Sequence, residues 1–145
     1  MLFTKTRDVK SPARGTDQSA GLDFFIPNDI EEDIVIQPGE SVNIPSGIKL
    51  MIPYGMAGIF FNKSGVGVKG VLVGACVVDS DYRGEVHLNV HNVSKKEVTF
   101  KAGQKLVQML IMPINMNSPM EIDGAQYDSY GLTQRGSGGF GSTGA

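Results

Sequence analysis

The sequence contains no tryptophan, one cysteine and two histidines in 145 residues, and these shortages exclude several kinds of site. A single thiol, Cys76, rules out a disulfide within the chain, and together with two histidines it supplies too few ligands for a zinc centre. The net charge is −2, so the chain has no basic field for nucleic acid or an anionic membrane. No apolar run approaches the ~18–20 residues that span a bilayer, and the N-terminus lacks the apolar region of a signal peptide. We therefore expect a soluble, cytoplasmic protein without nucleic-acid or membrane partners.

Helix-period stretches of useful length are also missing, whereas β-branched residues, 19 glycines and 7 prolines favour strands and turns. Turn signals stand at Pro38-Gly39 and at Pro45-Ser46. From Glu85 to Val93 the polarity alternates, so the apolar side chains face one way while His87 and His91 face the solvent. The expected strands are Ile34–Ile36, Ser41–Ile44, Gly47–Met51, Ala57–Phe61, Val71–Val73, Val77–Val78, Glu85–Val93 and Leu106–Met112. The pattern predicts an all-β fold, a sandwich or barrel-like jelly roll.

The C-terminal segment Arg135–Ala145 is rich in glycine and carries one arginine, one phenylalanine and several hydroxyls. Such a segment buries little and loses much backbone entropy on ordering, so by composition alone it is a flexible tail. Its backbone N–H groups, arginine and hydroxyls nevertheless suit phosphate oxygens, and Phe140 offers a flat face for a ring. We therefore predict a β domain at residues 1–134 and a flexible arm at residues 135–145 that acts as a nucleotide lid.

Four further segments place polar residues in or beside apolar strands. They are Ser19–Asp23, Asn62–Gly67, Val77–Glu85 and Gly103–Gln108. None of them is specific alone, because glycine-serine loops and acidic hairpin turns are common.

Taken together and in order, these segments and the arm resemble the five motifs of the trimeric dUTPase family, which read AGxDL, RSG, GVIDxDYRGEV, GxRxxQ and RGxGGFGSTG. In this chain the motifs correspond to Ala20–Phe24, Lys63–Gly65, Cys76–Val86, Gly103–Gln108 and Arg135–Gly144. The resemblance spans residues 20–144, and its third and fifth motifs are the specific ones. The compact chain looks like a phage or other viral member, which would place it in the host cytoplasm.

The resemblance implies a homotrimer with the jelly-roll or distorted β-barrel fold of this family. It implies a dUTP diphosphatase that uses Mg²⁺ to split dUTP into dUMP and pyrophosphate, which limits uracil in DNA and supplies dUMP for thymidylate synthesis. Each active site would combine segments of three chains, and the arm would close over it. No local cluster of carboxylates in the sequence holds Mg²⁺ unaided, so the substrate phosphates and water would supply most of its ligands.

The third motif carries the chemistry that the resemblance implies. Asp79 matches the family's catalytic aspartate, which holds and deprotonates the water that attacks the α-phosphate. An acid here is also compatible with a cap on the hairpin turn. Tyr82 matches the tyrosine that lies against the deoxyribose, with ordinary hairpin packing as the alternative. The main chain of the strand Val73–Val78, including Cys76 and Val78, would read uracil with one donor and one acceptor, a pattern that cytosine reverses.

The first, second and fourth motifs would hold and support the triphosphate. The resemblance assigns phosphate contacts to Lys63, Ser64 and the Gly65 amide, and to Gln108 from the fourth motif. A glutamine in an apolar strand needs partners in any case, so a structural role is the alternative for Gln108. Asp23 matches a first-motif aspartate that supports the site indirectly, and a purely structural role is as compatible with the sequence.

The family resemblance also implies that the arm completes the site. Arg135, Ser142 and Thr143 match residues that hold the terminal phosphates. Phe140 matches the ring that stacks over uracil, and Gly141 lies beside it in the motif.

Three departures from the family pattern bear on selectivity and rate more than on the fold. Lys63 stands where the family has arginine, so the charge is kept and the planar fork is lost. Cys76 stands where the family usually has glycine; if that glycine needs positive φ, the backbone is altered here. The spacer between Ser64 and Asp79 is somewhat shorter than usual.

Two other functions are compatible with such a fold. A dCTP-acting relative would use cytosine nucleotides, but the glutamate-base motif of the dCTP deaminases is not found in the sequence. A nucleotide-binding regulatory protein with little turnover would tolerate the changes at Lys63 and Cys76. The intact Asp79, Tyr82 and arm argue against the regulatory reading.

Overall fold

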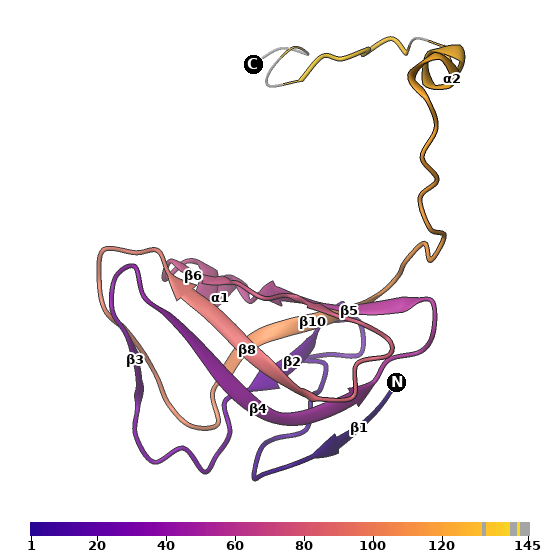
Figure 1. Cartoon of the computed structure of the whole chain (residues 1–145). Helices are drawn as coiled ribbons and strands as arrows, with labels where there is room; N and C mark the ends of the chain where they lie inside the picture. Colours follow the sequence, from indigo (N-terminus) through magenta and orange to yellow (C-terminus); the bar gives the residue numbers. More distant parts are fainter. Residues whose placement is uncertain (132, 140–141, 143–145) are drawn as a thin grey trace. The chain divides into compact units, whose positions relative to one another are not determined.

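The computed structural model describes residues 1–131, 133–139 and 142, and its first compact unit, Met1–Asn115, is built from antiparallel strands (Figure 1). One sheet has the order β1-β4-β8-β6, with bounds Leu2–Lys5, Ser41–Met51, Glu85–Asn92 and Val71–Val73. A second sheet has the order β2-β10-β5-β7, with bounds Leu22–Phe25, Lys105–Pro113, Met56–Asn62 and Val77–Val78. A third, smaller sheet pairs β3 (Ile34–Ile36) with β9 (Val98–Phe100). The predicted all-β class is confirmed.

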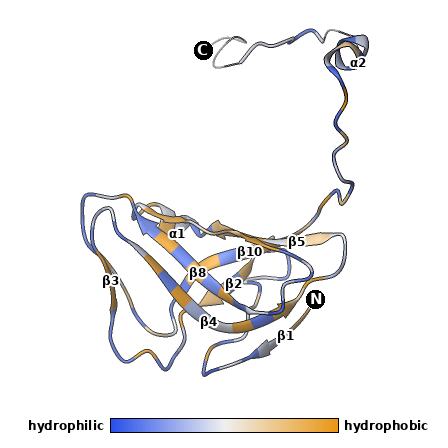
Figure 2. Ribbon diagram, in the orientation of Figure 1, coloured by the Kyte–Doolittle hydropathy of each residue, from blue (hydrophilic) through white to orange (hydrophobic). Residues whose placement is uncertain are grey.

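Both four-stranded sheets contribute to one apolar core. Along β8 the side chains alternate as predicted, with Val86, Leu88 and Val90 buried and His87 and His91 exposed. Figure 2 shows this alternation of apolar and polar residues along β8 and β4. The second sheet adds large residues to the same core, among them Phe24 and Phe60, whose rings meet edge to face with centroids 5.0 Å apart.

The turn predicted at Pro45-Ser46 is wrong, because β4 continues through these residues. The register of β4 against β8 shifts between Pro45 and Lys49. Gly47 has φ +74°, and its N–H donates to the Glu85 carboxylate at 2.5 Å. Pro45 and Gly47 therefore form an irregularity inside a paired strand. At such a place the sheet tolerates a proline, which has no N–H to donate to the neighbouring strand.

Val71–Val73 and Val77–Val78 form two strands as expected, whereas the continuous strand Val73–Val78 to which uracil binding was assigned does not form. β6 ends in the first sheet and β7 lies in the second, and residues 74–76 cross between them. The crossing is held by Asn89, whose main-chain oxygen accepts from the Gly74 N–H at 2.9 Å and whose Oδ1 accepts from the Ala75 N–H at 3.1 Å. A Cβ on Gly74 would come within 1.9 Å of Asn89 Oδ1, so only glycine fits this approach.

The described residues form two helices, and both are short. α1 (Ser64–Gly67) follows β5, and α2 (Gly124–Ser129) belongs to the second compact unit, Met116–Ala145. None of the described helices has the length and apolar character that crossing a membrane requires.

In the second unit, the described part of the arm contains local turns. The Arg135 Nε donates to the Gly138 carbonyl at 2.9 Å, and the Gly138 N–H donates to the Arg135 carbonyl at 3.0 Å. The boundary predicted between residues 134 and 135 lies inside this unit and stays a prediction.

Candidate functional site

Five of the predicted site residues of the first unit line two separate hollows, whereas Asp23, Lys63, Ser64 and Gly65 line neither. A hollow of about 540 Å³, here called the Cys76 hollow, is lined by Cys76 and Gln108 together with Ala20, Asn62 and Phe60, among others. A smaller hollow of about 180 Å³, here called the Asp79 hollow, is lined by Val78, Asp79 and Tyr82 together with Phe60, Val77 and Glu85, among others. Among the residues that the structure describes, Phe60 alone lines both. Within one chain, the third-motif residues Asp79 and Tyr82 thus line a different hollow from Gln108.

Asp79 lies in the turn between β7 and β8, and its side chain is exposed. Among the residues that the structure describes, its carboxylate makes no hydrogen bond or ion pair. The turn is closed instead by the main chain, where the Tyr82 N–H donates to the Asp79 carbonyl at 3.2 Å. The Asp79 carboxylate therefore does not cap the turn, which was the alternative role that the sequence allowed. It remains able to accept a proton or bind water.

Tyr82 folds back on its own turn. Its hydroxyl donates to the Glu85 carbonyl at 2.9 Å, and its ring passes so close to Gly84 that a Cβ there would lie 2.3 Å from the hydroxyl oxygen. Hairpin packing, the alternative that the sequence offered, is thus present. Tyr82 is still 44% exposed and lines the Asp79 hollow, so packing and a ligand contact are compatible.

The main chain of β7 presents hydrogen-bonding groups at a sheet edge. β7 is the last strand in its sheet and pairs only with β5, with Val77 opposite Ile59. The Phe60 N–H donates to the Cys76 carbonyl at 2.7 Å. Because the bonds of antiparallel strands alternate, the main-chain groups of Cys76 and Val78, the two residues expected to read uracil, face β5, whereas the N–H and C=O of Val77 point away from it. One donor and one acceptor therefore lie at this edge, next to the Asp79 hollow that Val77 also lines.

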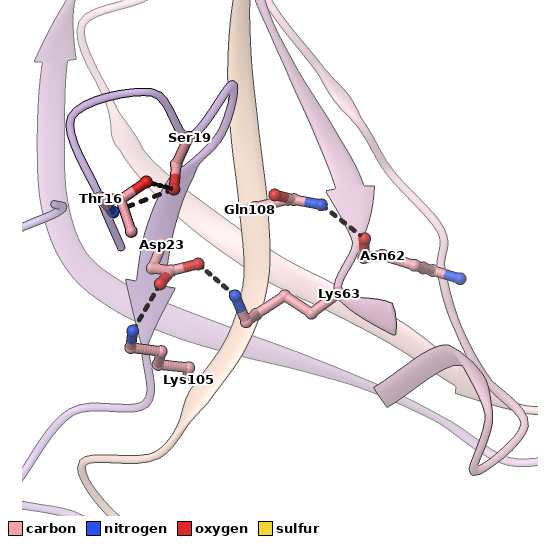
Figure 3. Close-up of polar contacts among 7 residues, drawn as sticks. All are labelled: Thr16, Ser19, Asp23, Asn62, Lys63, Lys105 and Gln108. Carbon is pink, nitrogen blue, oxygen red and sulfur yellow. Dashed lines mark hydrogen bonds and ion pairs between the residues drawn. The ribbon is translucent and has the colours of Figure 1, made fainter. Parts of the chain in front are cut away.

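A buried carboxylate on β2, that of Asp23, pairs with two lysines (Figure 3). The Asp23 side chain on β2 is only 5% exposed, and its two oxygens pair with the Nζ of Lys63 and, at 2.7 Å, the Nζ of Lys105. Burial alone would raise the pKa of Asp23, but the hydrogen bonds from Lys105 and Lys63 outweigh burial and lower the pKa below its ordinary value of 3.8. The carboxylate therefore stays ionised and fixes both ammonium groups.

Sequence reasoning singled out Lys63 and Asp23 but missed Lys105. A signal was present, because Lys105 occupies the arginine position of GxRxxQ and so keeps a cation there. Its partner Asp23 lies on β2, which pairs with β10 so that Gln108 stands opposite Asp23. The ion pair becomes visible only when that register is known.

Gln108 is held by the strand next to it. Its Nε2 donates to the Asn62 carbonyl at 2.9 Å, and a Cβ on Gly21 would lie 2.3 Å from its Oε1. Asn62, which sequence reasoning also missed, in turn accepts from the Val73 N–H through its Oδ1 at 2.7 Å. The structural role that the sequence left open for Gln108 is therefore present, and the residue also lines the Cys76 hollow.

The remaining predicted residues are exposed or lie outside the described residues. Ser64 and Gly65 begin α1 and are exposed, with no atom within 4 Å of a Cβ built on Gly65. In the arm, Arg135 and Ser142 are exposed. Phe140, Gly141 and Thr143 lie outside the described residues. No group of three or more His, Cys, Asp or Glu side chains within the described part of the chain is placed to hold a metal ion.

The ion pairs of Asp23 make stability depend on pH in a defined direction. Because the folded-state pKa of Asp23 is lowered, its contribution is fully present above the ordinary value of 3.8 and is lost as pH falls through the folded-state pKa. We expect Asp23→Asn to lower the free energy of unfolding by about 1–3 kcal/mol at neutral pH. The difference from wild type should shrink below pH 3.8, in urea titrations at fixed protein concentration. A difference that is constant with pH would contradict this origin.

Comparisons with known proteins bear on the whole chain. The sequence model of the family described as dUTPase matches residues 7–144. The deoxyuridine 5′-triphosphate nucleotidohydrolase of Alcanivorax borkumensis is 34% identical over 149 residues, which cover 99% of this chain and 95% of that protein.

Two solved structures have a similar fold. The Staphylococcus bacteriophage 80alpha dUTPase with dUPNHPP has a TM-score of 0.85 at 21% identity, covering 99% of this chain and 98% of that one. A variant of the dUTPase from phage phi11 of S. aureus, described as coordinating a structural Mg(II) ion, has a TM-score of 0.74 at 21% identity, covering 84% and 95%. At this identity the two structures bear on the fold alone, and they confirm the predicted fold class.

Proposed function

The chain belongs to the dUTPase family, and we propose on this premise that it is a dUTP diphosphatase that hydrolyses dUTP to dUMP and pyrophosphate. The structural observation that carries the proposal is Asp79, whose exposed carboxylate lies in a hollow and makes no bond among the described residues. A base that must take a proton from water needs such an accessible, unpaired oxygen. Removal of dUTP would limit uracil in DNA, and the dUMP would supply thymidylate synthesis.

In the proposed reaction, Asp79 orients a water molecule and accepts its proton. The water oxygen forms a bond to the α-phosphorus, the bond from that phosphorus to the bridging oxygen breaks, and pyrophosphate leaves with the electron pair. Lys63, Ser64, the Gly65 amide and Gln108 would hold the phosphates in line. The open space around Gly65 supports a close approach of phosphate to its amide.

Magnesium fits this site as a partner of the substrate. The triphosphate and water bring oxygen ligands of the kind that Mg²⁺ prefers, and no three-residue cluster of the described part of the chain competes to hold it alone. When bound, the ion neutralises negative charge on the phosphate oxygens. The residues of this chain then have to position the phosphates and the water.

Uracil would be read by the edge of β7. The N–H and C=O of Val77 offer one donor and one acceptor, as a base pair does, and uracil can match both through O4 and N3–H. Cytosine reverses this pattern and would leave buried groups unpaired, at about 1–3 kcal/mol each. Asn89 supports this selection because it fixes the main chain at Gly74 and Ala75 just before β7.

The active unit that we propose is a homotrimer with sites shared between chains. In one chain Gln108 of the fourth motif lines the Cys76 hollow, whereas Asp79 and Tyr82 of the third motif line the Asp79 hollow. A substrate that contacts all three residues would then be bound between hollows of two neighbouring chains. Arg135, Phe140, Gly141, Ser142 and Thr143 of an arm would close the site over the phosphates and the base.

Tyr82 should control the choice between deoxyribose and ribose. We expect Tyr82→Ala to raise the kcat/KM for UTP relative to dUTP by about tenfold or more, because the ring no longer occupies the place of a 2′-hydroxyl. Tyr82→Phe is the matched control, since it keeps the ring and loses only the hydrogen bond to the Glu85 carbonyl. Steady-state assays with both nucleotides measure the ratio, and an unchanged ratio in Tyr82→Ala would leave hairpin packing as the role of this residue.

The proposed activity is tested by incubating the protein with each nucleoside triphosphate and Mg²⁺ and measuring products. Release of pyrophosphate from dUTP, and little from dCTP or dTTP, is the expected result. Release of ammonia from dCTP would identify a dCTP-acting relative. Tight nucleotide binding without either product would identify a regulatory protein of the same fold.

A further inference from the structure

A third hollow lies outside the candidate site, beside the segment that leads into β9. This hollow, here called the Lys95 hollow, has a volume of about 570 Å³ and is lined by Val68, Lys69 and the six consecutive residues 94–99. None of these residues lines the Cys76 hollow or the Asp79 hollow. Because most of its lining is one continuous stretch of chain, the Lys95 hollow suits an extended ligand.

The Lys95 hollow gathers positive charge that has no counter-charge. Lys69, Lys95 and Lys96 line it against the single Glu97, which gives the lining a net charge of +2. Within the described part of the chain, none of the three ammonium groups makes an ion pair. The Glu97 carboxylate already accepts a hydrogen bond from the Gln37 Nε2 at 2.6 Å. Neighbouring cations repel one another, so an anionic ligand would relieve this repulsion.

The turn that presents Lys95 and Lys96 is held by a buried side chain. Asn92 is fully buried, its Nδ2 donates to the Lys96 carbonyl at 2.8 Å, and its Oδ1 accepts from the Ser94 N–H at 3.0 Å. Gly70, next to the lysine on the other side of the hollow, approaches Ser94 so closely that a Cβ on it would lie 2.6 Å from the Ser94 Cβ. Both sides of the hollow are therefore fixed before a ligand binds, which lowers the entropy cost of binding.

β9 adds free main-chain groups along the same hollow. Among the described strands it pairs with β3 alone, and Val98 and Thr99 of β9 line the hollow. Apart from this pairing, the main-chain groups of residues 97–100 make no hydrogen bond to any described residue. Such an edge is a template for a further strand, and lysines beside it discourage pairing with strands that carry no negative charge. The edge and the lysines together therefore select an acidic strand.

We propose that the Lys95 hollow binds an extended acidic peptide segment of a protein partner, which adds a strand to the edge of β9. The main chain of the peptide bonds to β9, and its carboxylates pair with Lys69, Lys95 and Lys96. These lysines have no part in the proposed hydrolysis, so partner binding and dUTP turnover are separate properties of the chain.

The probe for this site is a fluorescein-labelled peptide of alternating glutamate and valine, and its binding to the full chain is measured by fluorescence anisotropy. The double substitution Lys95→Met with Lys96→Met should weaken binding by about 5- to 30-fold, the usual effect of losing two exposed ion pairs. The matched control is Lys5→Met with Lys49→Met, which removes the same charge at exposed positions of β1 and β4. The control should bind within about twofold of wild type.

A second peptide separates strand addition from simple charge attraction. It has the same sequence but is N-methylated at every residue, so it keeps its carboxylates and loses its N–H donors. We expect it to bind about tenfold or more weakly than the unmethylated peptide, because its main chain cannot bond to an edge strand. Hydrogen exchange at residues 94–100 should slow when the unmethylated peptide is bound.

The proposal is supported if both the double substitution Lys95→Met with Lys96→Met and the methylation weaken binding, while the control variant keeps it. Equal binding of the two peptides, or of the two variants, overturns it. Absence of binding to the wild-type chain overturns it too and leaves protection of the edge as the role of the lysines. A changed mass of the assembly in the variant without Lys95 and Lys96 would assign this face to contacts between copies instead. Hydrolysis of dUTP should be equal in both variants and wild type, so a failure of the proposed function would be seen separately.

Discussion

Asp79→Asn is expected to lower kcat by about 10²–10⁴-fold, the usual effect of losing a general base. Asparagine keeps the shape of the side chain but cannot accept the proton of the attacking water. Because the Asp79 carboxylate makes no bond among the described residues, its removal should leave the turn intact. The loss should therefore fall on kcat, while the dissociation constant for a non-hydrolysable dUTP analogue stays within about threefold of wild type.

A neighbouring acid provides the control for this substitution. Asp81 is exposed in the same turn, so Asp81→Asn removes the same charge two residues away and should retain most of the activity. Steady-state kinetics of both variants with dUTP and Mg²⁺ make the comparison. Near-wild-type turnover of Asp79→Asn would reject the assignment, and equal losses in both variants would point to the charge of the turn instead of a base.

The strands with a strong period of two could be predicted from the sequence. In β8 the alternation of apolar and polar residues follows directly from one buried and one exposed face, and β5 and β10 have enough apolar residues for a buried strand. β1, β2 and β9 are absent from the expected strands. All four residues of Leu2–Lys5 are exposed, and the segment is a strand only because it pairs with β4, a partner that no local pattern reveals.

The two corrected segments have the same physical cause. Pro45-Ser46 has the composition of a turn, but the pairing of β4 with β8 continues past it and absorbs it as an irregularity. The runs Val71–Val73 and Val77–Val78 were expected as separate strands, but the continuous strand Val73–Val78 assigned to uracil does not form, because Asn89 on β8 accepts hydrogen bonds from the N–H groups of Gly74 and Ala75. In both places the local secondary structure is determined by pairing with a segment far along the chain and not by local propensity.

The candidate site was predictable as a set of residues but not as an arrangement. Motif order nominated Asp79, Tyr82 and Gln108, and the chemistry of each residue suggested its role. Lys105 could be connected to Asp23 only through the pairing of β2 with β10. The division of these residues between two hollows likewise depends on the sheet arrangement, which one sequence does not encode in any local signal.

The mixing of two inactive variants is expected to restore activity, because the proposed site takes its parts from different chains. One variant is Asp79→Asn, which keeps the arm, and the other is a chain truncated after Gln134, which keeps Asp79. Each alone should form inactive trimers. The two are unfolded together in equal amounts and refolded, and dUTP hydrolysis is measured together with the mass of the assemblies.

Random assembly makes about three-quarters of the trimers mixed, under three-fold symmetry. In a mixed trimer of either ratio, one Asp79 from a truncated chain has the arm of a neighbouring Asp79→Asn chain beside it, so one site of three is complete. The mixture should therefore recover about a quarter of the wild-type activity. If each site lies within one chain, no chain carries both parts and the mixture stays inactive. Absence of recovery, with mixed trimers present by mass, would reject the shared site while leaving the assignment of Asp79 and the proposed activity to their own tests.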